Sequence, residues 1–236
     1  MVRIIAHRGS SKQFPENSLA AFQQAVRSGA GALEVDLRRS ADGLIYCFHD
    51  YHLSRLTGYS GYFRRTDSSA IDKLRLLSSE SVLRFEDFLE EFAGRTEFVF
   101  DIKSAGIEVE ILRLVAPHSH RTGMIFSSFN SKTIARIKAL SPRTKTALIV
   151  GPMRNLKMKF DLSAHLIDKL TELNCHAVHL SHHIAKEGLV GRLSGAGFTV
   201  AVWTVDDLEA GVKLKNIGVN GIITNVPDVM KPLACQ

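Results

Sequence analysis

The chain has 236 residues and a mass of 26.1 kDa, a length at which one α/β barrel uses the whole sequence and two ordinary domains would be cramped. Hydrophobic residues make up 45% of it and charged residues 23%, values that exclude a disordered chain and predict a protein with its own core. The net charge is +6, but the basic residues are dispersed. Their two local concentrations, Arg64-Arg65 and the stretch 154–159, lie in no nucleic-acid motif, so we expect solvated surface there and no nucleic-acid partner.

Short β-branched or apolar runs alternate with amphipathic stretches from end to end. Strands are predicted at residues 2–6, 32–37, 44–48, 97–102, 123–128, 145–150, 176–180, 198–203 and 220–224. Helices are predicted near residues 17–28, 84–93, 107–115, 131–140, 163–173, 184–194 and 206–216. This alternation is typical of a parallel sheet wrapped by helices and predicts an α/β fold, a TIM-type (β/α)8 barrel. The predicted strands exceed the eight places in such a barrel by one.

The extra strand is the segment 44–48. The link from Asp36 to this segment is too short for a parallel crossover, and Asp42-Gly43 is a strong signal for a two-residue hairpin loop. We therefore expect a hairpin that extends the second strand beyond the barrel rim. With a two-residue loop, Asp36 lies opposite His49 and the two side chains share one face.

Residues 52–80 show weak periodicity and many Ser, Thr, Gly and Arg residues. They are predicted to form a loop excursion over the barrel mouth. No internal repeat or low-complexity tract is apparent. We therefore expect one domain over residues 1–236, a barrel with a hairpin extension after the second strand and a short loop insertion.

Three acidic residues lie near the carboxyl ends of predicted strands, the end that carries the active site in TIM barrels. Glu34 and Asp36 are two residues apart, so both carboxylates face one side of their strand, and Asp101 comes from another strand. Like charges at that spacing repel unless a metal ion or a basic side chain lies between them. Oxygen ligands favour Mg²⁺ or Ca²⁺ over zinc. The alternative is a solvated strand face or a plain salt bridge.

Basic and titratable side chains accompany these acids. Arg8 offers a planar fork of donors for a phosphate, and Lys103 offers a compact positive charge, although both could simply balance the acids. His7 and His49 titrate near neutrality and could serve as general base and general acid. Which histidine is the acid stays open, but a carboxylate opposite His49 should favour its protonated form.

Several motifs together resemble the glycerophosphodiester phosphodiesterases over nearly the whole chain. They are AHRG at 6–9, PENSLAAF at 15–22, LEVDLRRSADGLIYCFHD at 33–50, FDIK at 100–103, SSFN at 127–130, and VWTVDD and GVNGIITNVPD near the C-terminus. The first and third pieces, in this order and spacing, are specific to the family, whereas HRG alone would be a weak signal.

The resemblance implies a TIM barrel and roles for particular residues. These are His7 and His49 as catalytic residues, Arg8 and Lys103 as phosphate-contacting cations, and Glu34 and Asp36 as metal ligands. Asp101 stands where the family usually has glutamate, and its shorter side chain could reach the ion through water or weaken its binding. Residues 52–80 are short for the family's insertion, so substrate preference is not carried over.

Further residues have weaker claims. Trp203 matches a family tryptophan near the glycerol end of the substrate, with a barrel-core indole as the alternative, and Phe129 could line the same pocket. Glu16 and Asn17 resemble the cap of the first helix, although the family resemblance places them near the active site. Three histidines share another strand-to-helix junction: His179, His182 and His183. Because they lack acidic partners, we expect rim residues there and no metal cluster.

The expected activity is metal-dependent hydrolysis of a small glycerophosphodiester to glycerol 3-phosphate and an alcohol. Either water attacks directly or the glycerol 2-hydroxyl first closes a cyclic phosphate. A lysophospholipase D-type hydrolase would use the same site but would need an apolar groove. A non-catalytic phosphodiester-binding barrel would be favoured by loss of a histidine, and both are present.

The expected location is the cytoplasm. No apolar run approaches the roughly 18 residues needed to span a bilayer, and the N-terminus lacks the pattern of a signal peptide. Cys47, Cys175 and Cys235 are odd in number and far apart, as in a reduced compartment. We expect no stable membrane insertion.

Overall fold

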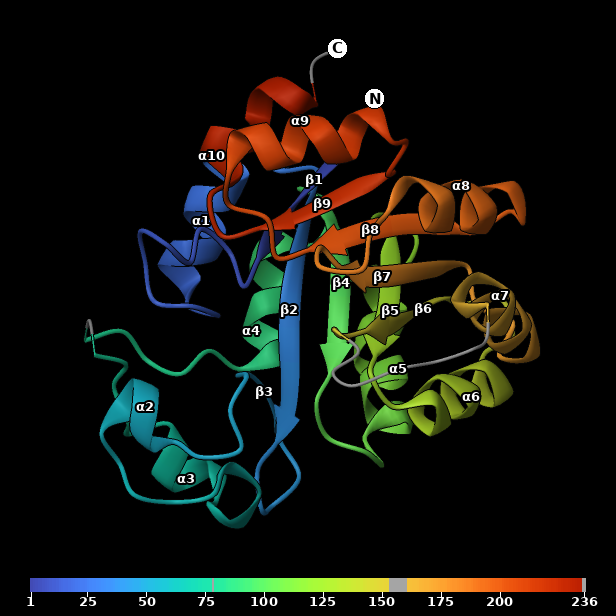
Figure 1. Cartoon of the computed structure of the whole chain (residues 1–236). Coiled ribbons are helices and arrows are strands. Elements are labelled where there is room, and N and C mark those ends of the chain that lie inside the picture. Colours follow the sequence, from blue (N-terminus) through green and yellow to red (C-terminus); the bar gives the residue numbers. More distant parts are fainter. Residues whose placement is uncertain (78, 153–160, 235–236) are drawn as a thin grey trace.

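A computed structural model describes residues 1–77, 79–152 and 161–234. Its sheet consists of β1 (Arg3–His7), β2 (Ala32–Arg39), β3 (Ile45–Cys47), β4 (Glu97–Ile102), β5 (Met124–Ser128), β6 (Lys145–Val150), β7 (Ala177–Ser181), β8 (Thr199–Trp203) and β9 (Gly221–Thr224). Within the described residues, eight of these strands are parallel and the pairing of β1 with β2 closes them into a ring, while β3 runs antiparallel to β2 (Figure 1). The predicted TIM barrel is confirmed, and the extra strand is the predicted segment.

Helices follow the barrel strands and pack on the outside of the ring (Figure 1). They are α1 (Leu19–Arg27), α4 (Phe85–Phe92), α5 (Glu108–Val115), α6 (Ser131–Leu140), α7 (Leu162–Glu172), α8 (Glu187–Gly195), α9 (Leu208–Asn216) and α10 (Pro227–Met230), with 3₁₀ turns η2 (Ala116–His118) and η3 (Lys231–Leu233). In α4 the buried side chains are Phe85, Phe88, Leu89 and Phe92, a helical spacing that forms one apolar stripe. Phe88 packs against Phe98 of β4 with ring centroids 4.9 Å apart. Amphipathic periodicity therefore explains why this segment is a helix and which face it buries.

The hairpin between β2 and β3 exists, but its predicted register was wrong by one residue. Leu37 pairs with Cys47, so the residue opposite Asp36 is Phe48, whose N–H donates to the Asp36 carbonyl at 2.9 Å. His49 lies two residues beyond the end of β3. The position of His49 is therefore set by the segment that follows β3 and not by the alternation of side chains along the strand.

The register differs because the hairpin loop has three residues instead of two. The Ser40 N–H donates to the Leu44 carbonyl at 2.9 Å, which leaves residues 41–43 as the loop. Gly43 has φ of 103°, a left-handed conformation that closes such three-residue loops. Asp42 Oδ1 accepts hydrogen bonds from Ser40 Oγ at 2.6 Å and from the Ser68 N–H at 2.9 Å, so a distant segment also holds the loop.

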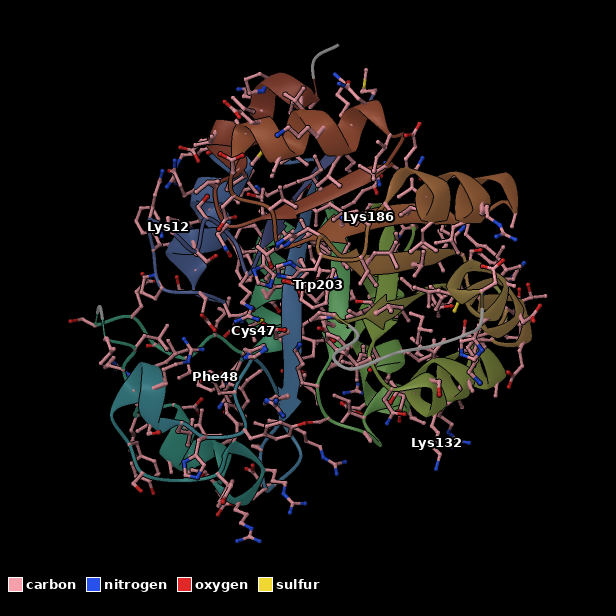
Figure 2. All side chains as sticks on the ribbon, viewed as in Figure 1. Lys12, Cys47, Phe48, Lys132, Lys186 and Trp203 are labelled. Carbon is pink, nitrogen blue, oxygen red and sulfur yellow. The ribbon has the colours of Figure 1, made fainter. Side chains whose placement is uncertain are left out.

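The excursion at 52–80 contains short helices: α2 (Ser54–Thr57), η1 (Phe63–Arg65) and α3 (Ser68–Ile71). It lies beside β3, away from the outer helices of the barrel (Figure 1). A small hydrophobic cluster holds it there, made of Tyr46, Phe48, Leu53, Leu56, Phe63, Ile71, Leu76 and Val82. Figure 2 shows Phe48 between the barrel strands and this excursion. The Tyr46 hydroxyl donates to Asp72 Oδ1 at 2.8 Å, and Arg84 forms an ion pair with the same carboxylate.

Small apolar side chains fill the interior of the barrel around Ile5, Val99, Ala201 and Ile223. No helix among the described residues is long and apolar enough to cross a membrane. Cys47 and Cys175 are buried free thiols. Cys235 and the basic stretch 154–159 lie outside the described residues.

Candidate active site

Three carboxylates meet at the carboxyl ends of β2 and β4. Asp36 and Asp101 are direct partners in the register of these parallel strands, and Glu34 precedes Asp36 by two residues on the same face. Oxygens of all three lie within 4.8 Å of one another, and the residues are only 5%, 0% and 4% exposed for Glu34, Asp36 and Asp101. The predicted convergence of the three acids is confirmed.

Two cations border this cluster. Arg8, the residue after β1, places Nε 2.9 Å from Asp36 Oδ2 and donates from a guanidinium nitrogen to Glu16 Oε1 at 2.9 Å. Lys103 Nζ lies 2.5 Å from Asp101 Oδ2 and 3.2 Å from Asp36 Oδ1. Attraction to these acids outweighs burial and raises the pKa of both basic groups. Both therefore stay charged and available to a phosphate.

The two cations do not satisfy the three acids. Asp36 Oδ1 and Asp101 Oδ1 are buried and accept no hydrogen bond from the described residues. Burial, followed by repulsion from Asp36 and Asp101, raises the pKa of Glu34 well above its ordinary value. A cluster that favours a proton and leaves buried oxygens without a hydrogen bond would be stabilised by a further positive charge. Oxygen-only donors of this kind fit a divalent metal ion.

His7, at the end of β1, is oriented by a hydrogen-bond chain. Its Nδ1 lies 2.8 Å from Asn225 Oδ1, which also accepts from Ser11 Oγ at 2.7 Å. The amide group of Asn225 donates to Asp206 Oδ2 at 2.7 Å, so its oxygen faces the imidazole. Nδ1 is therefore the protonated nitrogen, and Nε2 remains for a substrate. Burial, and then Arg8, lower the pKa of His7 to about 4, which keeps the ring neutral.

His49 follows β3, the second strand of the hairpin, and lines the same pocket as two of the acids. Its Nδ1 lies 2.7 Å from Asp50 Oδ1, and Arg55 of the excursion donates to Asp50 at 2.5 Å. Burial lowers the pKa of His49 and outweighs the opposing effect of Asp36. The expectation that a neighbouring carboxylate makes protonation the favoured state of His49 was therefore wrong in its net direction. The carboxylate acts as predicted, but desolvation is larger.

Glu16 and Asn17 do not cap the first helix. Ser18 is the N-cap of α1. Asn17 is buried with φ of 57°, and its side chain donates to Asp36 Oδ2 at 2.9 Å and accepts from the Asp36 N–H at 3.2 Å. Glu16 accepts two hydrogen bonds from Arg55, at 2.6 and 3.1 Å. Both residues thus lie at the site, as the family resemblance implied. Their position before a helix had suggested a cap instead.

A small pocket of about 100 Å³ opens beside the acids, with both catalytic candidates, Trp203 and Phe129 in its wall. The rings of Trp203 and Phe129 meet edge to face at 5.6 Å, and Lys103 Nζ lies 5.5 Å from the Phe129 centroid. Trp203 lies where the strands converge (Figure 2). Its Nε1 donates to the His179 carbonyl at 3.0 Å. The indole is partly buried against the barrel interior and also faces the pocket, so its two predicted placements coexist.

The three histidines at the junction of β7 and α8 do not share one environment. His182 and His183 are exposed with ring centroids 3.9 Å apart, as rim residues would be. His179 is buried inside the barrel on β7, at 2% exposure, so its expected rim position was wrong. Burial lowers its pKa to about 4. None of the three belongs to a potential metal-ligand group among the described residues.

Comparison with known proteins identifies the family. The family model for glycerophosphoryl diester phosphodiesterases matches residues 7–229. A glycerophosphodiester phosphodiesterase of Caldanaerobacter subterraneus subsp. tengcongensis is 28% identical, with 96% of this chain and 95% of the relative covered. A phosphodiesterase of Oleispira antarctica, solved in complex with the product sn-glycerol-3-phosphate, is 25% identical with a TM-score of 0.89, covering 99% and 97% of the two chains. A Thermotoga maritima glycerophosphodiester phosphodiesterase shares the fold at 22% identity and a TM-score of 0.83, covering 100% and 99%. The chain belongs to the glycerophosphoryl diester phosphodiesterase family.

Proposed function

We propose that this protein hydrolyses glycerophosphodiesters to glycerol 3-phosphate and an alcohol. The observation that carries the proposal is one small pocket at the carboxyl end of the barrel that is lined by two acids of the three-acid cluster, two cations and two candidate catalytic histidines. Family membership and the product bound to the Oleispira antarctica relative support the substrate class. The partner is a small molecule, and the cytoplasmic location stays a prediction.

Arg8 and Lys103 are proposed to hold the phosphate. Each is mostly buried, charged and paired with two carboxylates. A guanidinium has five N–H donors and an ammonium three, so the donors that these pairs leave over can face an anionic ligand. Lys103 would meet charge that develops on the phosphate oxygens in the transition state. Glu34, Asp36 and Asp101 would hold Mg²⁺ or Ca²⁺, which when bound supplies further positive charge against the phosphate.

His7 and His49 are proposed to divide the proton transfers. His7 is neutral with a proton on Nδ1, so its Nε2 can accept the proton of the attacking hydroxyl. His49 is the proposed acid, because the Asp50 carboxylate can accept a hydrogen bond from Nδ1 and, with Asp36, stabilise the protonated ring, although burial lowers the pKa overall. The bond from phosphorus to the departing alkoxide breaks as this oxygen takes a proton from His49.

A lysophospholipid substrate is less well supported. It requires an apolar groove for an acyl chain, whereas the larger groove beside the site, of about 800 Å³, carries several arginines in its wall. The non-catalytic alternative has no support in the histidines, because both line the pocket.

The decisive experiment measures glycerol 3-phosphate release from a panel of glycerophosphodiesters, with and without exhaustive chelation. We expect turnover that chelation abolishes and Mg²⁺ or Ca²⁺ restores. His182→Ala is a matched control for His7→Ala, because His182 is an exposed rim histidine outside the pocket. The hydrolase proposal is wrong if no diester is cleaved by metal-loaded protein, and the metal requirement is wrong if verified metal-free protein keeps full activity.

A further inference from the structure

A second, larger groove begins where the small pocket ends. It has a volume of about 800 Å³ and runs between the hairpin, the excursion and the loops after β4 and β5. Asp101, Lys103 and Phe129 line both spaces. A diester whose phosphate contacts Lys103 therefore has room for two arms, one in the small pocket beside Trp203 and one in the groove.

The groove is strongly basic. Four arginines line it: Arg38, Arg39, Arg64 and Arg65. In the described part of the chain none of the four forms an ion pair, whereas Arg8, Arg55 and Arg84 each contact a carboxylate at the edges of the site or excursion. Asp101 is the one acid in the lining among the described residues, and Lys103 already contacts it. Among the described residues the lining of the groove therefore carries a net positive charge, with no carboxylate paired to its four arginines.

Among the four arginines, Arg38 gives the strongest indication of an anionic ligand, because it is only 5% exposed. Its Nε donates to the His49 carbonyl at 2.6 Å and its guanidinium carbon lies 4.1 Å from the Tyr51 centroid. These contacts fix the planar group, and among the described residues no carboxylate forms an ion pair with it. Asp36 and Asp50 favour its charge only from a greater distance. A buried cation without a directly paired carboxylate is stabilised when an anion binds to it. A bound anion in the groove would provide that charge.

The aromatic side chains of the groove also favour an anionic ligand over a cationic one. Tyr51 stacks with Arg38, and Arg65 lies 5.3 Å from the centroid of Tyr62. A substrate ammonium group would have to share the rings of Tyr51 and Tyr62 with these two arginines. It would also meet repulsion from four guanidinium groups, so a cationic head group is disfavoured here.

We propose that this groove binds the alcohol half of the diester and selects alcohols that carry a second anionic group, a phosphate or a carboxylate. The inference rests on the proposed function. The glycerol half occupies the small pocket beside Trp203, the scissile phosphate contacts Lys103, and the second anion lies among the arginines. Arg39, Arg64 and Arg65, which are exposed, attract it, and Arg38 sets the planar donors at the inner end.

The test compares kcat/KM for four diesters of glycerol phosphate. Their alcohols are choline, glycerol, glycolate and glycerol bearing a terminal phosphate, so cationic, neutral, carboxylate and phosphate arms are separated. We expect both anionic arms to exceed the neutral arm by about tenfold or more at low salt, with choline lowest, and the preference to shrink as salt screens the charges.

The variant is the triple replacement Arg39→Gln, Arg64→Gln and Arg65→Gln, all at exposed positions that leave the catalytic groups in place. It should lose about tenfold in preference for the anionic arms and keep kcat/KM for the neutral diester within about twofold. Arg27→Gln is the control, since Arg27 is also exposed and forms no ion pair with a described carboxylate, but it lies on α1, outside the groove.

A binding measurement separates this inference from the proposed function. The His7→Ala protein is titrated with the neutral and the phosphate-bearing diester, and tighter binding of the latter should disappear in the same triple replacement. Equal affinities, or a preference that survives the replacement, would overturn the groove assignment even where hydrolysis is observed. Absence of hydrolysis of all four diesters by unaltered protein would instead overturn the proposed function, while the affinities still decide the role of the groove.

Discussion

Metal binding should compete with a proton at Glu34. Burial and the repulsion from Asp36 and Asp101 raise the pKa of this carboxyl well above its ordinary value, so the metal-free cluster favours its protonated form. Burial also raises the pKa of Asp101 to about 6. A metal ligand must be ionised, so binding the ion releases protons. Metal affinity should therefore fall as the pH falls, because lower pH favours the protonated, metal-free cluster.

The size of the effect follows from proton linkage. Below the raised pKa of Glu34, loss of one proton per ion bound makes the apparent affinity fall about tenfold for each pH unit, or about 1.4 kcal/mol. Below about pH 6, Asp101 should contribute further proton release and steepen the dependence. Calorimetric titration of Mg²⁺ or Ca²⁺ into chelator-treated protein gives the proton count, from the dependence of the measured enthalpy on the ionisation enthalpy of the buffer.

Two variants make the measurement specific. Glu34→Gln should weaken metal binding and remove most of the proton release near neutral pH. Glu97→Gln should change neither, because Glu97 begins β4, pairs with Arg3 and lies outside the acidic cluster. A binding enthalpy that is independent of buffer, with an affinity that is flat across this pH range, would refute the assignment of Glu34 as a protonated ligand.

Three further outcomes are expected. If the short side chain of Asp101 leaves a gap, Asp101→Glu should preserve or raise metal affinity in the same titration, and a large loss in a well-folded variant would contradict this. His7→Ala and His49→Ala should each lower kcat by about 10²–10⁴. A nitrophenyl ester of glycerol phosphate, which has a good leaving group, should rescue only His49→Ala, and an equal response of both variants would contradict the division of roles. Phe88→Ala, which empties a fully buried position, should lower the free energy of unfolding by about 3–5 kcal/mol in urea titration, and a loss under about 1 kcal/mol would contradict the packing argument.

Local patterns in the sequence were sufficient for the barrel and for most of the site. Strand and helix periodicity depends on which side chains face the core, so it placed the helices from α4 to α9 within a few residues of their observed bounds. The two-residue spacing of Glu34 and Asp36 required a shared face, which the structure confirms. Their meeting with Asp101 follows from the rule that parallel strands of a barrel end at one rim.

Contacts across loops were decided by the tertiary structure. The Asp42-Gly43 signal was compatible with two loop lengths, and the bonds from Asp42 to Ser40 and to the distant Ser68 accompany the longer one. That change of one residue removed the predicted pairing of His49 with Asp36, although the two remain electrostatic neighbours.

The groove and the supporting residues of the site also lay beyond sequence patterns. Glu16 and Asn17 stand before a helix, where a cap is the locally favoured interpretation, yet their side chains bind Arg55 and Asp36 instead. Arg38 and Arg64 are far apart in the sequence and line one cavity only because the excursion folds back beside the hairpin. Periodicity records the contact of each element with the core, whereas distances between side chains on different loops depend on how those loops pack together. The sequence by itself therefore determined the barrel, its acidic rim and the neighbouring cations and histidines as candidates, whereas the tertiary structure decided which loop residues support them and which arginines line the groove.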